Sequence, residues 1–137
     1  MEVLALVPAR GGSKGVPGKN IKPLKGIPLI GYTFQSVKNS QYISRTILTT
    51  DSEEIAKVGR QYNIEVPFLR PAELADDHSP AYEYIHHCLK FLAEKEEYQP
   101  DIIVLLQPTC PFRNGADIDA CINLLIGSDA DSVVSVA

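Results

Sequence analysis

Short apolar segments rich in β-branched residues alternate along this chain with segments whose apolar residues follow helical spacing. The expected strands cover residues 3–7, 45–50, 66–69, 102–106 and 132–136. The expected helices cover residues 29–38, 52–62, 81–95 and 116–126. Helices that connect parallel strands pack on the faces of the sheet, so this order predicts an α/β fold with a doubly wound, mostly parallel sheet.

The segment 102–106 reads IIVLL, without the alternation of polar residues that marks a half-exposed strand. Such a run is typical of a strand that helices cover on both faces. The last expected strand, 132–136, has no expected helix after it to cover it. We therefore expect residues 1–137 to form an incomplete domain, truncated at its C-terminus.

Composition excludes several classes of protein. With 137 residues, 45% of them hydrophobic, the chain fits one globular domain. A net charge of -4 argues against nucleic-acid binding, which usually needs a basic face. The chain has neither an apolar run of about 20 residues nor a basic signal-peptide start, so we expect no membrane span. Cys88, Cys110 and Cys121 are widely spaced and fit reduced thiols in the cytoplasm rather than a zinc site.

A glycine-rich basic loop follows the first expected strand. Residues 6–20 read LVPARGGSKGVPGKN, which places Arg10, Lys14 and Lys19 among four glycines. Ligands of parallel α/β sheets bind beyond the carboxyl ends of the strands, where this loop lies. Glycines let backbone N–H groups approach an anion, and arginine and lysine neutralise phosphate charge. The loop therefore predicts a phosphate site.

Two common phosphate motifs do not match this loop. Its glycines never show the G-x-G spacing that a dinucleotide fingerprint needs. The closest approach to a Walker A loop is SKGVPGKN at 13–20, which lacks the first glycine and the final hydroxyl residue. The sequence therefore argues against both a dinucleotide-binding protein and a P-loop NTPase.

The loop belongs to a set of four motifs that occur in order along the chain. These are PARGGSKGVPGKN at 8–20, TTDSEEIA at 49–56, VPFLRPAELADD at 66–77 and LLQPTCPFRNG at 105–115. Together they resemble the acylneuraminate cytidylyltransferases, which are the CMP-sialic acid synthetases and their legionaminate and pseudaminate relatives. Kdo cytidylyltransferases share the fold, but their loop usually lacks the GGSKG run. The resemblance covers the whole chain and implies a Rossmann-like nucleotidyltransferase fold.

In that family the anomeric hydroxyl of a nonulosonate attacks the α-phosphate of CTP, and pyrophosphate leaves. The resemblance implies CTP and a nonulosonate sugar acid as partners, Mg²⁺ as cofactor, a cytoplasmic location and a homodimer, without nucleic acid or membrane. The family's metal-binding Asp-x-Asp lies later than this chain extends, so we expect no metal ligand here and no turnover by the 137 residues alone. The alternatives are a truncated module that binds CTP without turnover and another sugar nucleotidyltransferase.

The resemblance also assigns roles to individual residues. It implies Arg10 and Lys19 as catalytic residues that hold the triphosphate and stabilise its reacting phosphate. The implied nucleotide-binding residues are Arg10, Gly11, Gly12, Ser13, Lys14, Lys19, Asn20, Arg70 and Ser79. The implied sugar-binding residues are Gln107 and Arg113. Taken without the resemblance, Arg70 is an exposed arginine at a strand end and Arg113 can face solvent.

Three aspartates have competing interpretations. Asp117 and Asp119 form an Asp-x-Asp, but they open an expected helix, where acidic groups favour the helix dipole, so we expect a helix start rather than a metal site. Asp51 ends an expected strand, where two roles are open and compatible: it faces the ligand, or it caps the following helix. If this chain does hold metal ligands, Asp51 is the first candidate.

Overall fold

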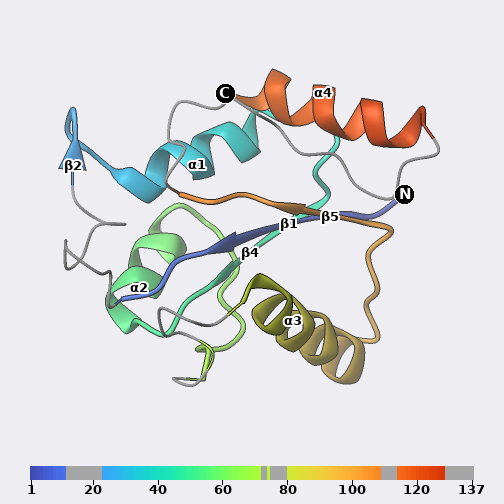
Figure 1. The fold of residues 1–137 in the computed structure, drawn as a ribbon. Helices are drawn as coiled ribbons and strands as arrows, with labels where there is room; N and C mark the ends of the chain where they lie inside the picture. Colours follow the sequence, from blue (N-terminus) through green and yellow to red (C-terminus); the bar gives the residue numbers. More distant parts are fainter. Residues whose placement is uncertain (12–22, 72–73, 75–79, 109–113, 129–137) are drawn as a thin grey trace.

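A computed structural model of the chain describes residues 1–11, 23–71, 74, 80–108 and 114–128 (Figure 1). Its strands are β1 (Val3–Pro8), β2 (Pro23–Leu24), β3 (Ile27–Pro28), β4 (Arg45–Thr49) and β5 (Ile102–Leu105). Its helices are α1 (Leu29–Lys38), α2 (Glu53–Gln61), α3 (Ala81–Glu96) and α4 (Gly115–Ile126). The four expected helices and the expected strands at 3–7, 45–50 and 102–106 are confirmed, with small shifts at their ends.

The main sheet has three parallel strands in the order β4-β1-β5. Leu6 at its centre pairs with Ile47 on β4 and with Leu105 on β5. Figure 1 shows α1 and α4 on one side of this sheet and α3 on the other, so the predicted α/β architecture is confirmed. A separate small hairpin pairs β2 with β3 through a turn at Lys25 and Gly26, both with positive φ.

The central strand divides the hydrophobic core into two layers. Alternate residues of β1 point to opposite faces of the sheet, as in any strand. Val3, Ala5 and Val7 join a core built with α1, α2 and α4, whereas Leu4 and Leu6 join a core built with α3. Every residue of β1 is buried, which fixes the position at which the chain leaves the sheet.

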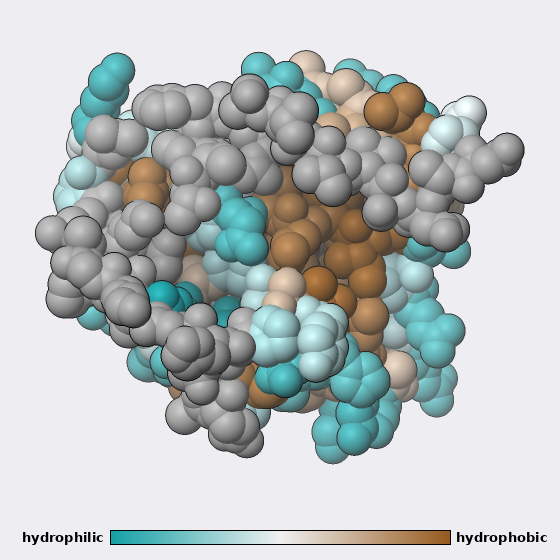
Figure 2. Space-filling view, in the orientation of Figure 1, coloured by the Kyte–Doolittle hydropathy of each residue, from teal (hydrophilic) through white to brown (hydrophobic). Residues whose placement is uncertain are grey.

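The strand β5 also packs on both layers, as its IIVLL sequence predicts. Ile102 and Val104 contact the core on the α1 and α4 side, and Ile103 and Leu105 contact the core on the α3 side. Within the described ranges β5 pairs only with β1, and its residues are partly exposed. Figure 2 shows hydrophobic surface at the middle of this face of the molecule, where β5 runs in Figure 1.

The expected strand at 66–69 is wrong. The chain makes one isolated parallel bridge between Ile47 and Glu65 and then runs beside β4 without forming a strand. The physical reason is Pro67, which has no backbone N–H to donate to a ladder. Two hydrogen bonds still hold this segment to β4: Leu48 N–H donates to Glu65 O at 2.9 Å, and Arg70 N–H donates to Thr50 O at 2.7 Å. The expected strand at 132–136 lies outside the described residues.

Candidate functional site

The path of the chain as it leaves β1 is set by the end of β4. Ala9 N–H donates to Thr49 O at 3.0 Å, and Gly11 N–H donates to Asp51 Oδ1 at 2.8 Å. Gly11 lies so close to the next element that an added Cβ would sit 3.0 Å from Ser52 Cβ. The absence of a Cβ in glycine makes this close approach easier. These contacts fix the start of the glycine-rich loop against the carboxyl end of the sheet.

Arg70 is a buried side chain at the same end of β4. It is 5% exposed, so its interpretation as an exposed arginine is wrong. Its Nε donates to Thr49 Oγ1 at 3.2 Å and its Nη2 to Thr49 O at 2.7 Å, while its Nη1 donates to Leu74 O at 3.1 Å. Arg70 therefore ties β4 to the segment that follows residue 70, through oxygens that carry no formal charge.

The charge of the Arg70 guanidinium is only weakly compensated. Burial lowers the pKa of Arg70, and the positive charge of Arg10 lowers this pKa further, while Tyr84 and Asp51 act to raise it. The guanidinium carbon lies 4.7 Å from the centre of the Tyr84 ring, a cation–π contact. Among the described residues, no carboxylate forms an ion pair with Arg70. Two like charges, Arg10 and Arg70, therefore act on each other at this end of the sheet.

Tyr84 connects Arg70 to the end of β5. Tyr84 lies on α3 and is buried, and Gln107 Nε2 donates to its hydroxyl at a long 3.5 Å. The sequence analysis missed Tyr84, although its spacing with Cys88 and Leu92 marks it as part of the buried stripe of a helix. The structure thus brings together Arg70 and Gln107, two predicted site residues that lie 37 positions apart in the sequence, with Tyr84 between them.

The competing interpretations of the aspartates are settled by their hydrogen bonds. Ser52, not Asp51, caps α2, because its side chain accepts the Ile55 N–H at 3.3 Å. The capping interpretation of Asp51 is therefore wrong, and its carboxylate faces the start of the loop instead. The helix-start interpretation of Asp117 is confirmed, because Asp117 and Asn114 form a capping box at the start of α4.

Asp119 also serves the fold. Its carboxylate accepts the Ser40 hydroxyl and, at 2.9 Å, the Gln41 N–H, which ties α4 to the end of α1. Partial burial acts to raise the pKa of Asp119, but the hydrogen bonds from Ser40, Gln41 and Tyr42 lower it overall. Within the described ranges, no group of three or more His, Cys, Asp or Glu side chains could hold a metal ion.

The described site residues gather at one end of the sheet. Arg10 and Gly11 follow β1, Asp51 follows β4 and Gln107 follows β5, so all lie beyond the carboxyl ends of parallel strands, where ligands of such sheets bind. The predicted residues Gly12, Ser13, Lys14, Lys19, Asn20, Ser79 and Arg113 lie outside the described part of the chain. Their roles stay predictions.

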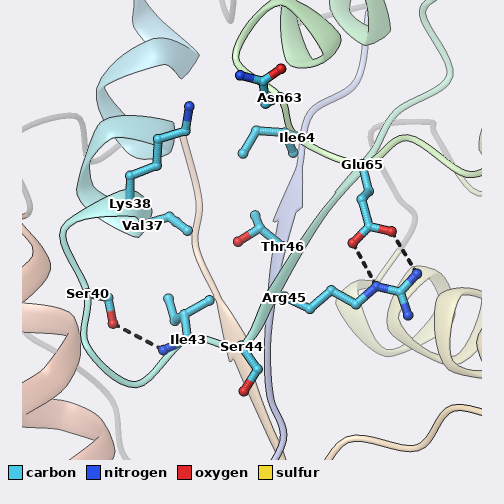
Figure 3. A pocket seen from close by; sticks show the side chains of 10 residues that line it. All are labelled: Val37, Lys38, Ser40, Ile43, Ser44, Arg45, Thr46, Asn63, Ile64 and Glu65. Carbon is cyan, nitrogen blue, oxygen red and sulfur yellow. Dashed lines mark hydrogen bonds and ion pairs between the residues drawn. The ribbon is translucent and has the colours of Figure 1, made fainter.

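A hollow of about 320 Å³ lies at the opposite, amino end of β4 (Figure 3). Arg45, in its wall, donates through Nε and Nη2 to the two oxygens of Glu65, each at 2.7 Å, and through Nη2 to Glu96 at 2.8 Å. Two carboxylates therefore neutralise this cation, which argues against an anion site there. We place the candidate site at the carboxyl end.

Comparison with known proteins shows which family the chain belongs to. A sequence model of the family described as "Cytidylyltransferase" matches residues 4–137. An N-acylneuraminate cytidylyltransferase of Escherichia coli is 37% identical over 123 residues, which cover 90% of this chain and 28% of that protein. A CMP-N,N'-diacetyllegionaminic acid synthase of Legionella pneumophila is 42% identical over 115 residues, which cover 82% of this chain and 48% of that protein. The chain thus spans less than half the length of either relative.

A solved structure shares the fold. A CMP:2-keto-3-deoxy-manno-octonic acid synthetase in complex with CTP superposes with a TM-score of 0.78 at 17% identity, over 95% of this chain and 49% of that protein. At this identity the likeness concerns the fold alone. None of the helices within the described ranges combines the length and apolar character needed to cross a membrane.

Proposed function

Because the chain belongs to the cytidylyltransferase family, we propose that it is the nucleotide-binding portion of an enzyme that transfers CMP from CTP to a nonulosonate. The anomeric hydroxyl of the sugar acid attacks the α-phosphate, and pyrophosphate leaves. One observation carries the proposal: the start of the glycine-rich loop, with Arg10, is fastened to the end of β4 beside the buried cation Arg70. The names of the two relatives support the choice of a nonulosonate over other acceptors.

In this reaction the protein supplies orientation and positive charge. Arg10 binds phosphate oxygens with its planar guanidinium and stabilises the charge that builds up on the leaving pyrophosphate, together with Lys19. Gly12, Ser13, Lys14 and Asn20 complete the loop around the nucleotide in this proposal. Fixing the attacking oxygen and the α-phosphate in line supplies the remaining rate enhancement.

Arg70 acts from behind the phosphates. Three of its five N–H groups donate to Thr49 and Leu74, so in this proposal Arg70 contributes a fixed positive charge and a hold on residue 74. Burial strengthens the field of such a charge because water screens it less. In this proposal Ser79 then contacts the nucleotide from the segment that Arg70 anchors.

Gln107 binds the sugar acid in this proposal. A neutral amide offers both a donor and an acceptor to sugar hydroxyls. Its amide nitrogen lies 3.5 Å from the Tyr84 hydroxyl, at the outer limit of a hydrogen bond. Arg113 follows Gln107 in the LLQPTCPFRNG motif, and in this proposal it pairs with the carboxylate of the sugar acid.

Magnesium is part of the proposal, but the described residues do not fit it. Asp117 and Asp119 are used by the α4 cap and by Ser40, and Asp51 binds the Gly11 N–H. When bound, Mg²⁺ would neutralise triphosphate charge. We assign none of its ligands in the described part of the chain. A cytoplasmic location and a homodimer are also proposals taken from the family resemblance.

The test is a comparison of substrates with the complete gene product. We expect calorimetry to show tighter binding of CTP than of ATP, GTP or UTP, and chromatography to show CMP-sugar formation with sialic, legionaminic or pseudaminic acid. Equal affinities for all four nucleotides would leave only generic triphosphate binding. CTP preference without turnover of any sugar acid would favour the binding module, and turnover of a sugar phosphate would favour another sugar nucleotidyltransferase.

A further inference from the structure

We infer that Asp51 is a positioning residue. It places Arg10 for the reaction by holding the backbone of Gly11, the next residue in the loop. The inference rests on the proposed function, because it concerns the same phosphate site. Asp51 lies directly after β4, and its Oδ1 accepts the Gly11 N–H at 2.8 Å. A carboxylate that accepts a backbone N–H makes a charge-assisted hydrogen bond, stronger than one between neutral groups.

Arg10 is flanked by two anchored residues. On its strand side, Ala9 N–H donates to Thr49 O at 3.0 Å, and on its loop side, Gly11 N–H donates to Asp51. The first anchor uses backbone atoms alone, so it does not depend on a particular side chain. The second depends on one side chain, so Asp51 decides whether the Arg10 backbone is fixed at both ends or only at one.

The charge of Asp51 has a second consequence. Arg10 and Arg70 repel each other, and Asp51 acts on Arg70 in the opposite sense. At Arg70 the Asp51 carboxylate therefore offsets part of the repulsion from Arg10 before an anionic ligand arrives. Asp51 is therefore suited to keep the site assembled in its empty state.

This assignment also changes what Gly11 contributes. Its amide hydrogen is directed to Asp51 rather than outward to a ligand. A Cβ added at Gly11 would lie 3.0 Å from Ser52 Cβ, which is closer than most Cβ contacts. Gly11 therefore serves the nucleotide site through its place in the backbone.

The competing role for Asp51 is that of a metal ligand. The described residues bring no second and third ligand to it. Substitution by asparagine separates the two roles, because Asn keeps an oxygen that accepts the Gly11 N–H but is a much poorer ligand for Mg²⁺ than a carboxylate.

The experiment compares Asp51→Ala, Asp51→Asn and Ser52→Ala in the complete gene product. Losing a hydrogen bond to a charged group predicts a drop of about 10- to 100-fold in kcat for Asp51→Ala, with a smaller change in KM for CTP. We expect Asp51→Asn to recover most of this loss and to keep the wild-type dependence of rate on Mg²⁺ concentration. Ser52→Ala removes the α2 cap but keeps the Cβ against Gly11, so it should lower Tm while kcat and KM stay unchanged.

Three results would overturn the inference. The first is a kcat for Asp51→Ala within twofold of wild type. The second is a decrease in kcat for Asp51→Asn as large as that for Asp51→Ala. The third is a higher Mg²⁺ concentration needed for full rate in Asp51→Asn than in wild type. If Asp51→Ala does not fold, the Asn variant still decides, because a loss beyond about tenfold exceeds what a weakened hydrogen bond explains. If the wild-type protein shows no CTP preference, the proposed function fails, yet weaker binding of inorganic tripolyphosphate by Asp51→Ala than by Asp51→Asn would still support the positioning role.

Discussion

Two arginines, Arg45 and Arg70, stand at opposite ends of β4, and each lies over a tyrosine ring. Arg45 begins β4 and lies 4.8 Å from the centre of the Tyr98 ring, while Arg70 contacts Thr49 at the end of β4 and lies 4.7 Å from that of Tyr84. They differ in their acceptors. Arg45 donates to the carboxylates of Glu65 and Glu96, whereas Arg70 donates to a hydroxyl and two carbonyls.

The difference in acceptors changes the electrostatics of the two ends. Hydrogen bonding to Glu65 raises the pKa of Arg45 most strongly, burial opposes this rise, and Glu96 adds to it. Burial instead lowers the pKa of Arg70. A cation paired with carboxylates stabilises a fold but attracts few anions. A cation held by neutral oxygens keeps its field for a ligand, which is why the proposed anion site is at the Arg70 end.

The comparison between the two ends predicts its largest effect, a decrease in kcat, for Arg10→Ala and for Lys19→Ala. Each variant should lower kcat by about 10²-fold or more, because in the proposed mechanism each removes a charge that stabilises the transition state. Steady-state kinetics of CMP-sugar formation measure it. Arg45→Ala is the matched control and should keep the wild-type kcat. Near-normal rates in both loop variants would make the loop a structural feature only.

The next effect concerns Arg70 itself. Arg70→Lys keeps the positive charge but cannot reproduce three directed hydrogen bonds to Thr49 and Leu74. We expect it to lower the free energy of unfolding by about 2 kcal/mol, as for the loss of hydrogen bonds to a charged group, and to weaken CTP binding. Urea unfolding and calorimetry measure the two quantities. Unchanged CTP affinity in a destabilised variant would mean that Arg70 serves the fold alone.

A smaller effect is expected at the amino end. Arg45→Ala should lower the free energy of unfolding by about 1 kcal/mol, because the partly exposed Arg45 pairs are screened by solvent. It should leave CTP affinity unchanged. The stability difference between wild type and variant should shrink in 1 M salt, which screens exposed charges. A loss of CTP affinity as large as that in Arg70→Lys would break the comparison between the two ends.

The smallest effect is a pH dependence at Asp119. Its pKa is lower in the folded state than in the unfolded chain, so its contribution to stability is present above the unfolded pKa and is lost as pH falls through the folded one. Thermal unfolding between pH 7 and pH 3 should therefore show a smaller loss of stability in Asp119→Asn than in wild type. Identical pH profiles would contradict the role assigned to the contacts with Ser40 and Gln41.

The sequence predicted the parts of the fold that local pattern controls. Apolar runs such as 3–7 and 102–106 need only their own residues to be recognised, and both became strands. The segment 66–69 has the composition of a strand, but Pro67 limits its pairing. The prediction of a strand there gave too much weight to composition and too little to this proline. The β2–β3 hairpin was missed because its turn, Lys25-Gly26, lacks the Asn-Gly or Asp-Gly sequence that marks two-residue turns.

Residues of the candidate site were predictable only where a motif supplied them. Arg10, Gly11, Arg70 and Gln107 were identified from motifs, and the structure places them at one end of the sheet. The burial of Arg70 and its contact with Tyr84 depend on residues that meet only after folding, so neither a strand-end position nor helical spacing could predict them. The same holds for the bond between Asp51 and Gly11, whose partners lie 40 residues apart.

The two anchors on either side of Arg10 have an entropic consequence. Fixing the backbone of one residue costs about 1–2 kcal/mol, and here that cost is met when the sheet forms rather than when a ligand arrives. Affinity for the phosphate ligand is thereby linked to the integrity of β4. Conditions that fray the end of this strand, such as mild denaturant, should weaken ligand binding before they unfold the domain.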